Sequence, residues 1–530
     1  MSKCTTGGCG AVRQPPAGTL LTIAGVNLRT LTLSLALALL TACHHSNDSS
    51  LGSAGSPSQR GALIDNPPAT VMTLSPDELL ALLADSDLGK TFLQLAYTPK
   101  CAITVYHLTY ETVDARDSLT PASGALMVPG GTDADCSGPR PLLLYAHGTT
   151  TDRTFDIAQL QADNNAEGVL LAAVFAAEGY IVVAPNYVGY DTSTLDYHPY
   201  LVGDQQSKDM IDALTAARAA LPTADVPNST DGGKLFVTGY SQGGYVAMAT
   251  HRAMQSSGMT VTASAPMSGP YALSAFGDAI FEGQVSDSAT VNVALLVVAY
   301  QKAYGDLYAK PADLFAPQYA DTIETLLPST TPLGDLRSQG KFPAALFDST
   351  PPQAAYAIYT PATSPAALAG VFAAGFGTDF LVNNSYRGAY LQDALAAPDG
   401  GFPALGDGLP PANPQNALRV HLKGNDLRSW TPTAPTLLCG GNSDPTVFFF
   451  NTTLMQNYWS AHAPAVAPVF LDVDSAATAG DPYANLKSGF AAAKELVRLS
   501  GGDTAVLAAY HAQLVPPFCL SAVKSFFDAH

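Results

Sequence analysis

The sequence has few basic residues and lacks the common metal and nucleotide motifs. Its 530 residues include 25 Lys and Arg against 44 Asp and Glu, which gives a formal net charge of -19. A strongly acidic surface repels nucleic acid and anionic lipid headgroups, so neither is expected as a partner. The sequence contains no H-E-x-x-H pattern, EF-hand loop or phosphate loop. We therefore expect a neutral substrate and no metal or other cofactor.

The N-terminal segment contains no acidic residue and no apolar run long enough to span a membrane. Its positive charges are Lys3, Arg13 and Arg29, and they precede an apolar run at 31–40. A run of this length is too short for a permanent transmembrane helix but is typical of a cleaved signal peptide. Residues 1–42 are therefore predicted to be a signal peptide.

The sequence Leu-Thr-Ala-Cys that ends at Cys43 resembles a bacterial lipobox. The resemblance implies cleavage before Cys43 and lipid attachment to its thiol, and the alternative is a plain secretory signal with a chance cysteine. His44 stands where an aspartate would resemble an inner-membrane retention signal, so an outer-membrane lipoprotein is expected, or otherwise a periplasmic or secreted protein. Membrane contact is expected only through this anchor. The Ser-, Gly- and Pro-rich segment 43–70 is predicted to be a flexible tether.

The cysteine count predicts two disulfides. Two of the seven cysteines lie in the predicted signal peptide, and Cys43 would carry lipid. The other four, an even number in a chain addressed to an oxidising compartment, allow three connectivities. We favour Cys101–Cys136 and Cys439–Cys519, because the members of each pair lie in the same part of the predicted fold.

Strand-like and helix-like segments alternate over much of the chain. This pattern predicts an α/β fold with a mainly parallel sheet covered on both faces, fed by an N-terminal hairpin. The predicted strands are 103–112, 123–128, 142–146, 181–184, 235–238 and 261–265, and the predicted helices are 168–177, 206–221 and 245–254.

The alternation stops after residue 272 and resumes near residue 436. The intervening segment, 273–435, contains apolar helical stretches broken by Pro and Gly, with no clear series of strands. We interpret it as a helical cap inserted between two parts of one core, 71–272 and 436–530. The second part is predicted to contain strands at 436–441 and 468–473 and helices near 486–499 and 521–528.

The pentapeptide 239–243, Gly-Tyr-Ser-Gln-Gly, has the G-x-S-x-G spacing of a nucleophile elbow. It lies between a predicted buried strand and a predicted helix, which is the setting that this motif requires. Gly239, Gly243 and Gly244 would let strand and helix approach without a Cβ collision. Ser241 is therefore the predicted nucleophile, and the alternative is an ordinary serine in a glycine-rich turn.

A serine nucleophile needs a base and an acid, expected in the order Ser, Asp or Glu, His. Asp444 follows a predicted strand in a loop, where α/β sheets carry functional groups. The alternative is an N-cap before Pro445. Asp472 and Asp474, which follow the next strand, are alternatives for the acid.

His511 is the predicted base. His462 ends a helix in an Ala- and Pro-rich run, and His530 is the chain terminus, where fraying would prevent precise positioning. A Cys439–Cys519 bridge would tie the segment after His511 to the strand that precedes the predicted acid.

Two backbone amides are expected to form an oxyanion hole. One is Gln242, directly after the nucleophile, and the other is Thr149, with Thr150 as the alternative. Gly148 permits close approach of this loop, and His147 is interpreted as a residue that braces it. The two tryptophans, Trp430 and Trp459, are interpreted as packing residues.

Four segments together resemble the secretory lipase-like branch of the α/β-hydrolase superfamily. They are the His-Gly loop at 147–148, the segment Asn-Tyr-Val-Gly-Tyr-Asp at 186–191 with His-Pro-Tyr-Leu at 198–201, the elbow, and Ser-Gly-Pro-Tyr at 268–271. The superfamily resemblance covers roughly 106–272 and 436–530. It implies an α/β-hydrolase fold and hydrolysis of carboxylic esters through an acyl-enzyme.

The leading hypothesis is a secreted or lipid-anchored serine esterase or lipase that acts on a small-molecule or polymeric ester. The apolar cap suggests an apolar acyl group or a polyester. One alternative is an exopeptidase of the same fold, in which Glu282 or Glu324 would bind a peptide amino terminus. The other is a catalytically silent surface lipoprotein.

Overall fold

The computed structural model describes residues 59–85, 87–93, 98–223 and 229–530. The predicted signal peptide, the predicted lipidation site Cys43 and the first part of the predicted tether lie outside the described residues. The described residues form one compact unit.

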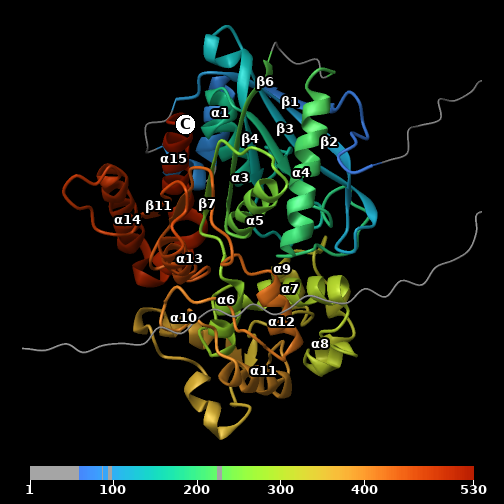
Figure 1. Cartoon of the computed structure of the whole chain (residues 1–530), viewed down its shortest axis with the longest axis vertical. Coiled ribbons are helices and arrows are strands. Elements are labelled where there is room, and N and C mark those ends of the chain that lie inside the picture. Colours follow the sequence, from blue (N-terminus) through green and yellow to red (C-terminus); the bar gives the residue numbers. More distant parts are fainter. Residues whose placement is uncertain (1–58, 86, 94–97, 224–228) are drawn as a thin grey trace, which may run out of the picture. The chain divides into compact units, whose positions relative to one another are not determined.

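Within the described residues, nine strands form one twisted sheet in the order β1-β2-β3-β5-β4-β6-β7-β10-β11 (Figure 1). From β5 to β11 every neighbouring pair is parallel, whereas β1, β2 and β3 pair antiparallel, as does β3 with β5. The α/β fold class and the N-terminal hairpin are thereby confirmed. The strands are β1 (Ala69–Leu74), β2 (Ala102–Val113), β3 (Leu119–Gly130), β4 (Gly138–Ala146), β5 (Ile181–Pro185), β6 (Ser229–Tyr240), β7 (Ala263–Met267), β10 (Leu437–Gly440) and β11 (Val469–Asp472).

Helices cover both faces of the sheet, as a parallel sheet with fully apolar central strands requires. Helices α4 and α5 pack together on one face, and α1, α3 and α15 lie on the other (Figure 1). The core helices are α1 (Pro76–Asp85), α2 (Asp87–Leu93), α3 (Ala166–Val174), α4 (Gly203–Ala220), α5 (Gln242–Ser256), α13 (Phe450–Ala461), α14 (Ala484–Ala509) and α15 (Val515–Asp528).

The N-terminal boundary of the core differs from the sequence prediction. Residues 59–70 were assigned to a flexible tether, but Gly61 N–H donates to the Glu111 carbonyl at 2.8 Å and Ile64 N–H donates to Thr109 at 2.9 Å. Arg60 also pairs with Asp212 at 3.0 Å. The polar composition of this segment resembles a linker, but the open edge of β2 offers unpaired backbone groups that the segment satisfies.

The helical insertion lies between β7 and β10, as predicted, and is drawn in green through yellow to orange in Figure 1. The insertion consists mainly of helices, and each of its two strands is only two residues long. Its elements are α6 (Leu273–Phe281), α7 (Ala289–Tyr304), α8 (Pro317–Ala320), α9 (Leu333–Ser338), β8 (Phe347–Asp348), α10 (Ala369–Ala374), β9 (Phe376–Gly377), α11 (Asn384–Ala396) and α12 (Ala417–Gly424).

Two buried arginines connect the segments of the insertion. The Arg419 guanidinium pairs with Asp278 on α6 and Asp393 on α11, both at 2.8 Å. Arg428 pairs with Asp399 at 2.6 Å and with Asp426 at 2.9 Å. Because these guanidinium groups are fully buried, each needs its carboxylates to offset the loss of hydration.

Both predicted disulfides are confirmed. Cys101 and Cys136 join the start of β2 to the turn before β4, with Cα atoms 5.3 Å apart. Cys439 on β10 joins Cys519 on α15, with Cα atoms 5.7 Å apart. The second bridge connects the strand that carries the predicted acid loop to the helix that follows His511.

The last helical segments are longer than the predicted ones. One π-helical turn, Tyr510–Leu514, connects α14 to α15 and contains His511. The stretch Ala484–Asp528 is long and apolar enough to cross a membrane, but 67% of its most apolar window is buried inside the protein. Its apolar side chains therefore belong to the core of this domain.

Candidate active site

Ser241 occupies a sharp turn between β6 and α5. Its backbone has φ 59° and ψ −121°, a conformation that a non-glycine residue adopts only when its surroundings impose it. A Cβ at Gly243 would collide with the Ala146 carbonyl, and a Cβ at Gly244 would collide with Met267. The glycines therefore allow α5 to begin directly against the ends of β4 and β7, as the elbow motif predicts.

The structure brings the three predicted catalytic side chains into one hydrogen-bonded chain. His511 Nε2 lies 2.8 Å from Ser241 Oγ, and His511 Nδ1 lies 2.6 Å from Asp444 Oδ2. In this geometry Nδ1–H donates to the carboxylate, which leaves Nε2 free to accept the serine proton. The three groups come from the carboxyl ends of β6 and β10 and from the π-helical turn.

Asp444 also has the structural role considered in the sequence analysis. Its second oxygen, Oδ1, accepts the Thr446 N–H at 2.9 Å and the Val447 N–H at 3.0 Å. The same buried carboxylate thus caps the following turn and orients His511. The two interpretations of this residue are compatible, because each uses a different oxygen.

The alternative acids and bases have other partners. Asp472 accepts hydrogen bonds from Asn442, and Asp474 accepts the Tyr510 hydroxyl at 2.7 Å. His462 contacts the Tyr458 carbonyl, and His530 contacts the Phe526 carbonyl. None of these four groups bonds to Ser241 or His511. Asp474 instead supports the residue that precedes His511.

Opposing effects act on the pKa of His511. Burial lowers it, but the nearby carboxylates of Asp444, Asp287 and Glu167 outweigh burial, so the pKa lies above the ordinary histidine value. The imidazolium form is therefore stabilised at the atom that would receive a proton. This stabilisation is the electrostatic contribution expected of the acid in a Ser-His-Asp arrangement.

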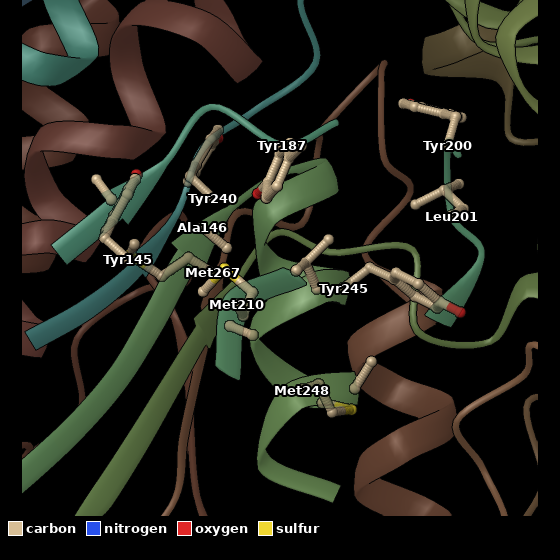
Figure 2. Packing of buried hydrophobic residues seen from close by; sticks show 14 of the residues in the cluster. Tyr145, Ala146, Tyr187, Tyr200, Leu201, Met210, Tyr240, Tyr245, Met248 and Met267 are labelled. Carbon is tan, nitrogen blue, oxygen red and sulfur yellow. The ribbon is translucent and has the colours of Figure 1, made fainter. Parts of the chain in front are cut away.

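Two tyrosines hold the histidine segment in place. Tyr240 donates its hydroxyl to the His511 carbonyl at 2.6 Å, and the Ser443 N–H donates to the Tyr510 hydroxyl at 3.1 Å. Figure 2 shows Tyr240 and Tyr187 close to the carboxyl ends of the central strands, with Tyr245 projecting from α5. Together with the Cys439–Cys519 disulfide, these contacts restrict the loops on which the three side chains stand.

The two predicted oxyanion donors have free amides. In the part of the chain that the structure describes, neither the Gln242 N–H nor the Thr149 N–H donates to a protein acceptor. The neighbouring Gly148 N–H is occupied, because it lies 3.2 Å from each carboxylate oxygen of Glu167. The Thr149 hydroxyl is 2.8 Å from the Tyr200 hydroxyl. The assignment of Gln242 and Thr149 as oxyanion donors stays a prediction.

His147 braces its loop and lies apart from the hydrogen-bonded chain. Its ring stacks on Tyr187 with centroids 4.2 Å apart, and its Nε2 lies 3.1 Å from the Asn186 carbonyl. Burial lowers the pKa of His147 to about 4, so the ring is neutral near pH 7. The interpretation of this residue as a loop brace fits these contacts.

A second buried histidine fixes the side chain of Gln242. Burial lowers the pKa of His198 to about 3, and its neutral Nε2 accepts the Gln242 Nε2–H at 2.7 Å. The other ring nitrogen, Nδ1, donates to the Val188 carbonyl at 3.0 Å. His198 belongs to a motif that the sequence resemblance identified, although its role as a support for Gln242 was not predicted.

Two cavities of different size meet at Ser241. The larger, about 1020 Å³, has a mixed lining that includes Gly148, Thr149, Glu167, Asp287, Thr446 and His511. The smaller, about 70 Å³, is enclosed chiefly by apolar side chains of α6, α7 and α12, among them Leu273, Phe276, Ile280, Val293, Leu296 and Leu422. No Lys or Arg from the described ranges lines either cavity. Because α6, α7 and α12 all belong to the insertion, the insertion forms most of the wall of the narrow cavity.

Glu167 is the site residue that the sequence analysis missed. It lies in the first turn of α3 and accepts the Tyr145 hydroxyl at 2.6 Å in addition to the Gly148 N–H. Burial raises the pKa of Glu167 to about 6. An acidic residue at a helix start is common, so its sequence position gave no signal of its place in the cavity wall.

The residues proposed to bind a peptide amino terminus do not reach the cavities. Neither Glu282 nor Glu324 lines them, and Glu324 accepts the Tyr308 hydroxyl at 2.9 Å. The tryptophans are packing residues as predicted, because the Trp459 Nε1–H donates to the Trp430 carbonyl at 2.7 Å and neither ring lines a cavity.

Among the described residues, one set of three potential metal ligands occurs, and it does not line either cavity. His107, Asp156 and Asp191 have ligand atoms within 4.8 Å of one another. His107 Nε2 lies 2.7 Å from Asp191 Oδ2, which also accepts the Ser123 hydroxyl at 2.6 Å. The hydrogen bond to Asp191 raises the pKa of His107, against the effect of burial. These groups therefore satisfy one another as an ion pair.

Comparisons with known proteins found one matching family model and several similar solved structures. Residues 170–287 match the model of the prolyl oligopeptidase family. The rice cell wall degrading esterase LipA from Xanthomonas oryzae is 26% identical, with 85% of this chain and 97% of that chain covered and a TM-score of 0.60. Its ligand-bound form is 25% identical, with 86% and 99% covered and the same TM-score of 0.60.

A protein from Legionella pneumophila is 18% identical, with 88% of this chain and 97% of that chain covered and a TM-score of 0.61. At this identity the likeness concerns the fold alone. No curated protein matches the chain.

Proposed function

We propose, from the premise that this chain is a serine hydrolase of the α/β-hydrolase superfamily, that it cleaves uncharged carboxylic esters through an acyl-enzyme. The observation that carries the proposal is the hydrogen-bonded chain of Ser241, His511 and Asp444 at the junction of a narrow apolar cavity and a wider cavity of mixed lining. An ester has an acyl part and an alcohol part on either side of its carbonyl carbon, and the two cavities accommodate them separately.

In the first half of the reaction, His511 Nε2 takes the Ser241 proton while Oγ attacks the carbonyl carbon. The carbonyl oxygen gains a negative charge, for which the Gln242 and Thr149 amides are the proposed donors. The tetrahedral intermediate collapses, the carbon–oxygen bond to the alcohol breaks, and the imidazolium returns its proton to the leaving alkoxide. An acyl-serine and a free alcohol result.

In the second half, water enters the wide cavity and attacks the acyl-serine. His511 takes one water proton, the same donors hold the oxyanion, and the proton then passes to Ser241 Oγ as the carboxylic acid leaves. In both halves of the reaction, Asp444 keeps Nδ1–H in place and stabilises the imidazolium. The same stabilisation is seen in the pKa of His511, which Asp444 raises.

The cavities support an assignment of the two parts of the substrate. The narrow cavity is apolar and enclosed, which fits a short or slender acyl chain, because burial of each CH₂ there contributes about 0.8 kcal/mol. The wide cavity fits a bulky or polymeric alcohol part. The lining of the wide cavity is acidic and includes no described Lys or Arg. This charge favours uncharged over anionic substrates. The similarity to a cell wall degrading esterase supports a polymeric natural substrate.

The cellular location is a separate proposal that rests on the N-terminal sequence. The lipobox-like sequence before Cys43 supports a lipid-anchored protein at the bacterial outer membrane, with release as a periplasmic or secreted enzyme as the alternative. The two disulfides support an oxidising compartment.

An exopeptidase is the second candidate, because part of the chain matches the prolyl oligopeptidase family model. Asp287, at the N-terminal side of α7, lines the wide cavity and could accept a peptide ammonium. The acyl side argues against this activity, since the narrow cavity is chiefly apolar and a peptide backbone there would leave polar groups without partners.

The test is a combination of active-site labelling and a substrate panel on the purified protein. We expect a fluorophosphonate probe to modify Ser241, as located by peptide mass spectrometry, and we expect turnover of p-nitrophenyl esters but not of aminoacyl p-nitroanilides. Preferential anilide turnover would favour the exopeptidase. A folded protein that takes up no probe and hydrolyses neither panel would instead be a silent surface protein.

The narrow cavity gives a prediction for acyl specificity. Val293 on α7 lines this cavity, and Val293→Phe would fill part of its volume of about 70 Å³. We expect kcat/KM for hexanoyl esters to fall roughly tenfold or more relative to acetyl esters, because each methylene excluded from an apolar pocket costs about 1 kcal/mol. The measurement is a chain-length profile from acetyl to octanoyl p-nitrophenyl esters.

Val420→Phe is the matched control, because Val420 on α12 is exposed and lines neither cavity. The control should keep the wild-type profile. An unchanged profile in Val293→Phe would place the acyl chain in the wide cavity.

A further inference from the structure

Glu167 is a half-buried carboxylate in the wall of the wide cavity, next to the loop that carries the proposed oxyanion donor. Its Oε1 accepts the Tyr145 hydroxyl at 2.6 Å, and both of its oxygens lie 3.2 Å from the Gly148 nitrogen. A Cβ placed on Gly148 would lie 3.5 Å from Glu167 Oε2 and 3.9 Å from the Ser241 Cβ. The carboxylate and the nucleophile therefore flank the same glycine.

The fold of α3 does not require a carboxylate at this position. The side chain of Asn165 already caps the helix by accepting the Gly168 N–H at 3.1 Å. In the described part of the chain, no Lys or Arg forms an ion pair with Glu167. A half-buried carboxylate with no cationic partner is partly deprived of its hydration, so its place beside the nucleophile calls for an explanation in the chemistry of the site.

We propose that Glu167 is a positioning residue for the proposed ester hydrolysis. By accepting the Gly148 N–H, it fixes the Gly148–Thr149 peptide so that the Thr149 N–H stays free to bind the oxyanion. Its negative charge also stabilises protonated His511. This inference rests on the proposed function and adds to it a residue outside the Ser-His-Asp set.

The first part follows from the hydrogen bonds of the loop. Each peptide N–H can serve one strong acceptor. The Gly148 N–H is directed to Glu167, and the next N–H along the chain, on Thr149, has no protein acceptor among the described residues. If the carboxylate were absent, the Gly148 N–H would lose its buried partner, and the loop could rotate to satisfy it elsewhere. An oxyanion hole is effective only when its donors are already oriented.

The second part follows from the charges around His511. The carboxylates that act on its pKa are Asp444, Asp287 and Glu167, and no described Lys or Arg lines the cavity beside it. Glu167 in turn is close to the Tyr145, Tyr187 and Tyr240 phenols, whose own pKa values burial raises, so these groups stay neutral. Only the ionised form of Glu167 can stabilise the imidazolium. Removing that charge should lower the pKa of His511.

The sign of the expected pH effect is therefore fixed. His511 must be neutral to accept the Ser241 proton, so activity falls on the acid side as His511 becomes protonated. With Glu167 ionised, the pKa of His511 is higher and the acid limb of the kcat/KM profile lies at higher pH. In Glu167→Gln this limb should move to lower pH.

The experiment compares Glu167→Gln and Glu167→Ala with the wild-type enzyme on a soluble p-nitrophenyl ester. Glutamine keeps an oxygen that can accept hydrogen bonds from Tyr145 and Gly148, so kcat of this variant at the pH plateau should stay within about threefold of wild type. The acid limb should move to lower pH by roughly half a pH unit, because the charge that is lost is partly screened. Alanine removes the acceptor, so kcat should fall roughly 10- to 100-fold with little change in KM, because a donor is misplaced but still present.

Glu324→Gln is the matched control. Its carboxylate also accepts a tyrosine hydroxyl, from Tyr308 at 2.9 Å, but it lines neither cavity. This variant should keep both the pH profile and kcat of the wild type.

Four outcomes separate the possibilities. The inference is overturned if Glu167→Gln keeps the wild-type acid limb, or if Glu167→Ala keeps the wild-type kcat. It is also overturned if the alanine variant loses activity only in proportion to a loss of folded protein, measured by circular dichroism and by fluorophosphonate labelling. Failure of the wild-type enzyme to take up the probe or to hydrolyse the ester would instead contradict the proposed function.

Discussion

Replacement of Ser241 by alanine is expected to lower kcat for p-nitrophenyl esters by about 10⁶-fold, because no acyl-enzyme can form without Oγ. The hydroxyl is the atom that lies 2.8 Å from His511 Nε2, and the rest of the turn does not depend on it. Alanine and serine both carry a Cβ, so the backbone strain at φ 59° is the same in the variant and the fold should be retained. The measurement is steady-state hydrolysis together with the thermal unfolding midpoint.

Ser257→Ala, at the opposite end of the helix that Ser241 begins, is the matched control. The Ser257 hydroxyl donates to the Ala253 carbonyl at 3.0 Å and does not line a cavity, so activity should not change. The double variant Ser241→Ala/His511→Ala should be no slower than Ser241→Ala alone, because residues that act as a unit are not additive. Substantial ester turnover by a folded, single Ser241→Ala variant would rule out the assigned nucleophile.

Arg428→Met is expected to lower the free energy of unfolding by about 3–5 kcal/mol, the range observed when one partner of a buried ion pair is removed. Arg428 is fully buried and bonds to Asp399 at 2.6 Å and to Asp426 at 2.9 Å. Asp426 also accepts the Ser274 N–H at 3.0 Å at the start of α6. Without the guanidinium, two buried carboxylates would repel each other where the insertion returns to the sheet. Chemical denaturation measures the effect.

A second substitution tests the cause of this destabilisation. Arg428→Met/Asp399→Asn removes one uncompensated charge and should recover part of the lost stability, whereas a cavity or packing defect would persist. Arg337→Met, at an exposed position on α9 of the same insertion, should change stability by less than about 0.5 kcal/mol. A loss below about 1 kcal/mol in Arg428→Met would show that water reaches the two carboxylates.

Local sequence patterns were sufficient for the central strands of the sheet and for the residues near Ser241. The apolar runs before Ser241 and Asp444 are strands β6 and β10, and the glycines of the elbow stand where any Cβ would collide with backbone. Patterns of this kind are local, because a buried parallel strand must be apolar throughout and a tight strand-to-helix turn tolerates only glycine at certain positions.

Local patterns failed where a segment acquires its role from a distant partner. Residues 59–70 were assigned to the tether because their composition resembles a linker, and they bond to the sheet only because β2 presents an open edge. Glu167 was missed for the same reason. Its sequence position is that of an ordinary acidic residue at a helix start, and only the loop at Gly148, brought beside it by β4, makes it part of the cavity wall.

The sequence by itself determined the α/β class, the elbow, the order of nucleophile, acid and base, and the number of disulfides. These follow from periodicity, spacing and the number of cysteines. The tertiary structure alone decided which histidine nitrogen meets Ser241, that Asp444 serves two partners at once, and that two unlike cavities converge on the nucleophile. Such features depend on atoms from segments up to 270 residues apart, whose approach is set by packing of the whole domain and not by any local pattern.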